Sequence, residues 1–339
     1  MQYGIFDHLE RRSDVGLAQQ YEERLQLVQF ADEAGIYGYH VAEHHHSPLC
    51  LAPNQAVYLA AVAQRTKRLK LGSLVYVLPL HQPIRLIEEI CMVDQLSDGR
   101  MQIGVGPGVL GGAEFKMWGG DGLESRERFE ETLEILRRGL QCEFLTYHGK
   151  HFDYDDLWME LRPKQAPHPP FWYAGNAESA ARRGMNFIGG GPISAIAQSV
   201  ERYKALWREG ADDAETTRPS EPLYGGTQHI FIADSDEEAH DRVATAWTAY
   251  RGHFPKPHSA GNEVVQAAPR AGGPAPETPA VVCGSAATVR HYVQAYVERS
   301  GANYFVPAFQ WGDLTHKEAL HSMTLFATEI MPAIAAAAK

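Results

Sequence analysis

Residues 69–108 read LKLGSLVYVLPLHQPIRLIEEICMVDQLSDGRMQIGVGPG. The apolar run over 69–78 predicts a buried strand, and apolar side chains then recur at helical spacing over 84–91. The Asp-Gly pair at 98–99 supplies a turn, after which a second apolar run at 101–105 predicts another strand. Strand, helix and strand in this order form the repeating unit of a parallel sheet.

The same unit repeats along the chain. Short apolar or β-branched runs alternate with stretches of helical period, such as the apolar stripe over 129–140. This alternation predicts the α/β class and a closed (β/α)8 TIM-type barrel; an open doubly wound sheet is the alternative, but no GxGxxG motif follows the first strand. We expect Asp94 and Arg100 to form an ion pair between a helix and the next strand. The predicted strands are 3–7, 37–42, 69–78, 101–105, 171–174, 186–189, 228–233 and 303–308.

Two segments interrupt the alternation. Residues 143–170 contain aromatic and turn residues, which predict an inserted hairpin. Residues 253–279 are rich in Pro, Gly and Ala, so we expect a flexible loop that is either a passive surface segment or a lid over the barrel mouth. With these insertions, we interpret residues 1–339 as a single TIM-barrel domain.

The composition narrows the class of partner. A formal net charge of −11 argues against nucleic acid and anionic membranes, because both require a basic surface. The four cysteines show no CxxC pairing, so no disulfide scaffold or zinc knuckle is indicated. The first residues lack the features of a signal peptide, and no apolar run reaches membrane-spanning length. We therefore expect an unprocessed cytoplasmic protein that binds a small molecule.

Residues 41–48 read VAEHHHSP and follow an apolar run. They place His44, His45 and His46 at the carboxyl end of a predicted strand, where α/β enzymes keep their catalytic groups. Imidazole rings move protons near neutral pH or bind metal ions, so a metal-dependent hydrolase is one reading of this run. The later strand ends offer apolar residues and glycine instead of further ligands. We therefore favour proton handling and expect no bound metal.

Residues 69–108, with AEHHHSP and Asn54, resemble the bacterial luciferase-like flavin monooxygenases, whose members read HPxRxAExxxxLDxLSxGRxxxGxGxG. The match is dense over residues 1–130 and stays in register through the later strands. The resemblance implies a TIM-type barrel that binds reduced FMN, or in one branch a deazaflavin coenzyme, and uses O2 to oxygenate a small organic substrate. The alternatives are a deazaflavin-dependent oxidoreductase of the same fold and a non-catalytic flavin-binding protein.

An enzyme of this kind needs a supply of reduced flavin. Because the chain shows no dinucleotide fingerprint, we expect a separate flavin reductase that uses NAD(P)H. We also expect a homodimer. Gly106 and Pro107 stand where luciferase has a cysteine and an arginine, a departure that removes one cationic contact and predicts open space beside the flavin ring. Light emission therefore does not follow from the resemblance.

The resemblance also assigns residues to the proton and to the flavin ring. His44 matches the catalytic histidine of the family, and we expect His45 to orient it or to bind the backbone, and Glu43 to fix a tautomer. Leu74 and Val75 are expected to form an apolar wall for the ring, joined by a cis peptide bond.

The flavin phosphate is expected at the turn over 174–179, which follows the fifth predicted strand and opens a helix. Gly175 lets the backbone approach an anion and Asn176 can cap the helix, whereas Glu178 would repel a phosphate unless its carboxylate points away. Arg126, near another helix start, supplies a cation. The predicted cofactor-binding residues are Leu74, Val75, Gly106, Arg126, Ala174, Gly175, Asn176 and Ser179.

Overall fold

Eight parallel strands pair in a closed ring and form a barrel. The computed structural model describes residues 1–108, 113–118, 122, 124–210, 218–254 and 280–337. The ring of paired strands excludes the open sheet and confirms the predicted TIM-type barrel. Its strands, in order around the ring, are β1 (Gln2–Asp7), β2 (Gly38–Val41), β3 (Lys70–Ser73), β5 (Met101–Gly106), β8 (Phe171–Ala174), β9 (Asn186–Gly189), β10 (Tyr224–Ile232) and β12 (Tyr304–Ala308).

The strands differ from the prediction at three places. The run at 69–78 is divided into β3, β4 (Tyr76–Val77) and the 3-10 turn η1 (Leu78–Leu80), because the chain breaks its pairing at 74–75. β10 begins at Tyr224, before the predicted start at 228. β11 (Val281–Gly284) was not predicted, and it pairs with the carboxyl half of β10 outside the closed ring.

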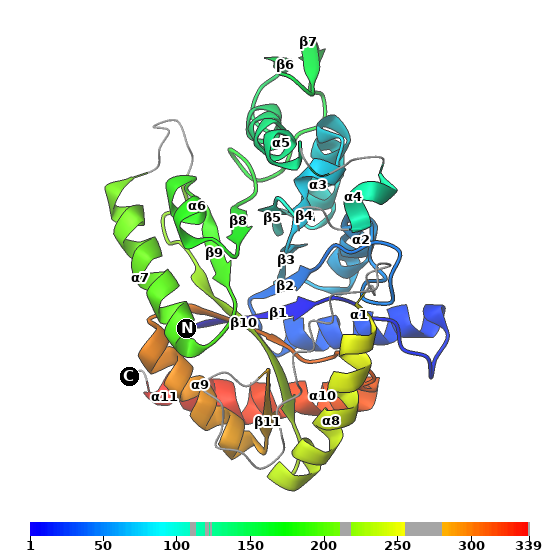
Figure 1. Cartoon of the computed structure of the whole chain (residues 1–339), viewed down its shortest axis with the longest axis vertical. Coiled ribbons are helices and arrows are strands. Elements are labelled where there is room, and N and C mark those ends of the chain that lie inside the picture. The colour runs from blue at the N-terminus through cyan, green and yellow to red at the C-terminus, as the bar shows by residue number, and fades with distance from the viewer. Residues whose placement is uncertain (109–112, 119–121, 123, 211–217, 255–279, 338–339) are drawn as a thin grey trace, which may run out of the picture.

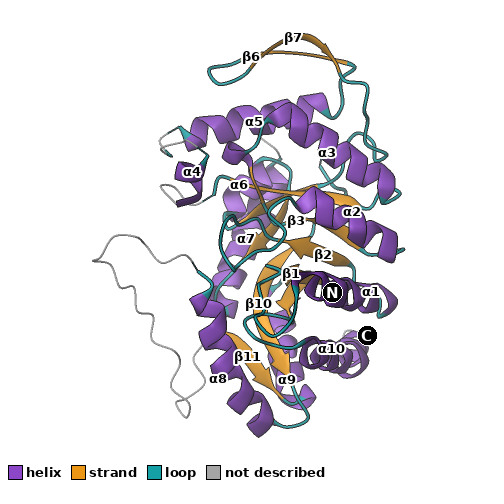
Figure 2. Ribbon diagram, turned by 90° about the vertical axis from the view of Figure 1, so that its right-hand side faces the viewer, coloured by secondary structure: helices purple, strands orange, loops and turns teal. Residues whose placement is uncertain are grey.

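Helices surround the barrel, as Figure 1 and Figure 2 show. The predicted apolar stripe over 129–140 is confirmed, since Phe129, Leu133, Leu136 and Leu140 are all buried. The helices are α1 (Leu17–Glu33), α2 (Gln55–Arg65), α3 (Pro83–Leu96), α4 (Ala113–Met117), α5 (Ser125–Gly139), α6 (Ala177–Arg182), α7 (Ile193–Glu209), α8 (Asp236–Gly252), α9 (Ala286–Ser300), α10 (His316–Leu325) and α11 (Met331–Ala337), with a π-helical turn η2 (Phe326–Ile330) between the last two.

Tyr304 of β12 fills the barrel interior. A Cβ atom on Gly4 or Gly38 would lie 2.1 or 2.6 Å from its hydroxyl oxygen, so the neighbouring strands need glycine at these positions. The hydroxyl group is 2.9 Å from Nε2 of His40, and the ring of Trp172 packs against both side chains. The interior is therefore a packed core that closes the barrel beneath its carboxyl end.

Residues 144–158 form an antiparallel hairpin of β6 (Phe144–His148) and β7 (Asp153–Trp158). The hairpin projects beyond α5 (Figure 2). Its tip is fixed to that helix, because Glu131 accepts the backbone N–H groups of Lys150 and His151 at 2.9 and 3.0 Å. The other predicted insertion, 253–279, lies outside the described residues from residue 255 onward.

The ion pair predicted between Asp94 and Arg100 is wrong, although both side chains hold the fold together. The Arg100 guanidinium donates to the carbonyl oxygens of Ala63 and Leu69, each at 2.9 Å. The Asp94 carboxylate accepts the backbone N–H of Gln165 at 2.8 Å. Backbone groups of neighbouring segments therefore satisfy both charges, and sequence spacing alone does not reveal such partners.

The last helix of the chain, formed by α10, η2 and α11, covers residues 316–337 without a break. Its 22 residues are long and apolar enough for a membrane span, although the sequence shows no uninterrupted apolar run of that length. Ala319, Met323, Phe326 and Ile330 lie in the hydrophobic core of the barrel. One face of this helix is therefore packed against the barrel.

Candidate active site

The carboxyl ends of neighbouring barrel strands bring the predicted site residues to one end of the barrel. His44 follows β2, whose last residues pair with β3. Val77 of β4 is in register with Gly106 of β5, and Val105 is in register with Tyr173 of β8. The loop after β2, the wall at 74–75 and the turn after β8 therefore lie on adjacent strand ends.

His44 is partly exposed, and a carboxylate holds its ring. Its Nδ1 atom lies 3.2 Å from Oε1 of Glu114 on α4, and the same oxygen accepts the backbone N–H of His45 at 3.0 Å. The ring of His8 lies on another side, with 5.6 Å between ring centroids. Burial would raise the pKa of Glu114, but hydrogen bonds from His44 and His45 and the charges of both rings lower it. A partly exposed histidine beside an ionised carboxylate is suited to proton transfer.

Sequence reasoning missed Glu114. It lies 70 positions from His44, on a helix of five residues, and no motif connects the two segments.

Glu43 is placed to fix the tautomer of His45, the neighbour of His44 in the chain. Its buried carboxylate contacts Nε2 of His45 and Nε2 of His81, both at 2.9 Å, and accepts the N–H of Val77 at 2.9 Å. Burial is the largest influence on the pKa of Glu43 and would raise it, but the charge of His81 and these hydrogen bonds lower it to about 2. Burial likewise opposes a charge on His81, and the pKa of that ring is nevertheless raised by Glu43.

Leu74 and Val75 lie between β3 and β4, and the peptide bond that joins them is cis, as the resemblance implies. Nε2 of Gln55 donates to the carbonyl oxygen of Val75 at 3.1 Å. The space predicted beside Gly106 is not open, because a Cβ atom there would lie 2.7 Å from Cγ2 of Val75. Glycine at 106 thus makes room for the wall.

The turn after β8 has the geometry of a capped helix start. Ala174 ends the strand, and the Asn176 side chain accepts the N–H of Ser179 at 2.9 Å, so the predicted cap is confirmed. Gly175 has φ of +84°, a conformation that favours glycine. A Cβ atom on Gly175 would meet no atom within 4 Å, so the backbone of the turn is open on that side.

The hydroxyl group of Tyr173 is influenced both by this turn and by Arg126, the arginine predicted to bind the phosphate. Burial raises the pKa of its hydroxyl group, whereas the charges of Arg183 and Arg126 and a hydrogen bond with Ser179 act in the opposite direction. The Glu178 carboxylate is held at 3.0 and 3.1 Å by arginines of α6 and α7, so its charge is compensated. Ser179 therefore neighbours the Tyr173 hydroxyl group, and Arg126 lies within electrostatic range of it.

A cavity of about 380 Å³ opens between η1, α4 and the tip of the hairpin. Phe115, Trp118 and Phe152 give it aromatic walls, and His81 and Arg128 add polar groups. Its volume suits a small organic molecule. Another cavity, of about 320 Å³, lies at the opposite end of the barrel, before β8 and β9, and is remote from the histidine run at 44–46.

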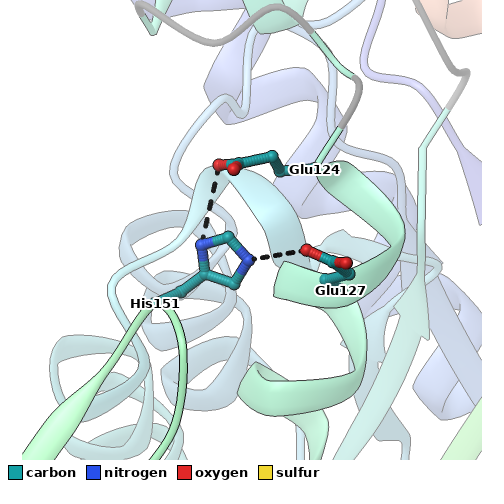
Figure 3. A group of neighbouring side chains, drawn as sticks. All are labelled: Glu124, Glu127 and His151. Carbon is teal, nitrogen blue, oxygen red and sulfur yellow. Dashed lines mark hydrogen bonds and ion pairs between the residues drawn. The ribbon is translucent and has the colours of Figure 1, made fainter.

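Figure 3 shows Glu124 and Glu127, at the start of α5, together with His151 of the hairpin tip. The His151 ring nitrogens lie 3.7 and 3.3 Å from the two carboxylates, whose geometry resembles a metal-binding group. Nζ of Lys150 lies 3.3 and 2.6 Å from the same carboxylates and already supplies a positive charge. Within the described parts of the chain, the histidine run at 44–46 is not part of such a group.

The chain matches the luciferase-like monooxygenase family over residues 1–304. It is 35% identical to the uncharacterized protein y4wF of Sinorhizobium fredii, over 97% of this chain and 96% of that protein. It is 28% identical to the oxygenase component of a flavin-dependent trigonelline monooxygenase of Acinetobacter baylyi, over 70% of this chain and 67% of the relative.

The fold superposes on the oxygenating constituent of 3,6-diketocamphane monooxygenase from Pseudomonas putida, a type II Baeyer-Villiger monooxygenase solved in complex with FMN. The TM-score is 0.76 at 20% identity, and 98% of each chain is covered. The family match and the relative at 35% identity show that the chain belongs to the luciferase-like monooxygenases. Flavin-dependent monooxygenation is the general class of its activity.

Proposed function

We propose that this chain is the oxygenase of a two-component system, which binds reduced FMN and uses O2 to oxygenate a small organic substrate. A separate flavin reductase would supply reduced FMN at the expense of NAD(P)H. The observation that carries the proposal is the adjacency of three features on neighbouring strand ends: His44, the wall at 74–75, and the Ser179 turn with Arg126. The relative named as an oxygenase component supports the division into two proteins.

The residues present fit FMN. Leu74 and Val75 would form the apolar wall for the ring, with Gly106 behind Val75. Arg126 and Ser179 would hold the phosphate, with the open backbone at Ala174, Gly175 and Asn176 beside them. Reduced FMN, when bound, supplies the electrons that activate O2.

His44 is the proposed proton-handling group. Because its Nδ1 faces Glu114, its Nε2 atom is left to meet the reacting molecules. The Glu114 carboxylate, whose own pKa is lowered, holds the ring in one orientation. The aromatic cavity beside His81 is the proposed entry for a small organic substrate.

The phosphate assignment is tested with Arg126→Ala. Losing one charge-assisted contact should weaken FMN binding by about 1.5 to 3 kcal/mol. Fluorescence titration of FMN measures the change. Arg85→Ala is the matched control, because Arg85 is an exposed arginine in the first turn of α3 and pairs with Glu89. Equal affinities in the wild type and Arg126→Ala would remove Arg126 from the site.

The activity is tested by supplying reduced FMN from a reductase with labelled O2, and by recording the masses of products from a panel of small organic substrates. Incorporation of one labelled oxygen atom is the expected result. Turnover with a reduced deazaflavin coenzyme but not with reduced FMN would show that the cofactor is the deazaflavin coenzyme. The homodimer and the cytoplasmic location stay predictions, which sedimentation and cell fractionation can check.

A further inference from the structure

The strand ends of the site are joined through one buried carboxylate. The Glu43 side chain is 0% exposed, so it cannot contact a substrate directly. Its two oxygens contact His45, His81 and the backbone N–H of Val77, each at 2.9 Å. A carboxylate only accepts hydrogen bonds, so all three groups donate to it.

Gln55 extends these contacts to the predicted flavin wall. Its Nε2 atom lies 3.4 Å from Glu43 and donates to the carbonyl oxygen of Val75 at 3.1 Å. Val75 and Val77 on one side, and His45 on the other, are therefore tied to the same side chain. A displacement of Glu43 would move the wall and the histidine loop together.

We propose that Glu43 is a positioning residue of this site: with His81 as its counter-ion, it holds the wall at 74–77 against the loop that carries His44, and this arrangement sets the affinity for the flavin ring. The inference rests on the proposed function, because it assumes that the wall receives a flavin. Burial opposes a charge on either group, yet the pKa of Glu43 is lowered and that of His81 is raised, because each group favours the charged form of the other.

Comparing the binding of riboflavin with that of FMN distinguishes an effect on the wall from an effect on the phosphate site, because riboflavin carries the same ring without the phosphate. Glu43→Gln places an NH2 group among three donors and should raise the dissociation constants of riboflavin and FMN by the same factor, about tenfold or more. The visible absorption band of the bound flavin should also shift. Arg126→Ala should weaken the binding of FMN and leave the binding of riboflavin unchanged.

Asp32→Asn is the matched control. Asp32 is a buried carboxylate that accepts the backbone N–H groups of Lys67, Arg68 and Leu69, near the start of β3 and away from the histidines. Its loss should lower the melting temperature without changing flavin affinity. Gln55→Met removes the contacts with Val75 and Glu43 but leaves the carboxylate in place, so it carries the test if Glu43→Gln does not fold. It should weaken the binding of riboflavin and FMN by an equal, smaller factor.

Two results would overturn the inference. One is riboflavin affinity in the folded variants within twofold of the wild type. The other is an equal loss of affinity in Asp32→Asn, which would make the effect one of general stability. Wild-type protein that binds neither flavin would instead contradict the proposed function, and the role of Glu43 would fall with it.

Discussion

At the scale of single residues, the carboxylate that each histidine contacts determines how that histidine ring is held. His44 and His45 are neighbours in the chain, yet Glu114 holds the first ring and Glu43 holds the second. Glu114 is partly exposed, whereas Glu43 is buried. We therefore propose that His44, beside the partly exposed carboxylate, exchanges protons with a bound molecule, whereas the ring of His45 is held by a buried group.

His44→Ala should lower product formation by roughly 100-fold, the scale of general acid–base assistance. The variant should still fold and bind FMN, because the wall and the predicted phosphate ligands belong to other segments of the chain. Product yield with supplied reduced FMN, together with an FMN titration, measures both quantities.

His46 supplies the control for this prediction, since it lies in the same run but is exposed. Its φ is +49°, so Asn is the suitable replacement, because Asn tolerates this conformation. His46→Asn should keep full turnover. If His44→Ala also kept it, the histidine would not be the proton-handling group.

At the scale of elements, the wall depends on how closely β5 approaches the break between β3 and β4. A Cβ atom on Gly104 would lie 2.2 Å from the carbonyl oxygen of Ser73, and one on Gly106 would lie 2.7 Å from Val75. Both glycines of β5 therefore act through shape, by letting the broken strand pack against them.

Gly106→Ala should destabilise the protein by about 1 to 3 kcal/mol, the usual cost of overpacking, and should weaken flavin binding because Val75 has to shift. Urea denaturation and FMN titration measure the two effects. Gly16→Ala is the control, since a Cβ atom there would meet nothing within 4 Å. A Gly106→Ala protein as stable as the Gly16→Ala protein would show that Val75 can move without cost.

Periodicity was sufficient to predict the barrel strands, because each is a short apolar run followed by a helical segment. It did not reveal β11, whose four residues follow a Pro- and Gly-rich stretch, or the break at 74–75, where the apolar run continues while the pairing changes. The His44 loop and the Asn176 cap follow from local motifs. Glu114 and the true partners of Glu43 do not, since only the closed barrel brings those segments together.

At the scale of the whole molecule, the barrel interior makes stability depend on pH. His40 is 0% exposed and lies between Trp172 and Tyr304. Burial lowers its pKa from 6.5 to about 3. Below pH 6.5 the unfolded chain therefore binds a proton at this residue that the folded barrel does not bind until about pH 3. The contribution of His40 to the free energy of unfolding is therefore fully present above pH 6.5 and is lost as the pH falls from 6.5 to about 3.

The free energy of unfolding should thus fall between pH 6.5 and pH 4, with His40 contributing on the order of 1 kcal/mol per pH unit. Urea denaturation at pH 7 and pH 5 measures the loss. His40→Gln cannot titrate and keeps a polar partner for Tyr304, so the difference between the two pH values should shrink, whatever the stability of the variant at pH 7. His291→Gln, an exposed change on α9, should leave the difference as in the wild type. An unchanged difference in His40→Gln would show that the acid sensitivity arises from other groups.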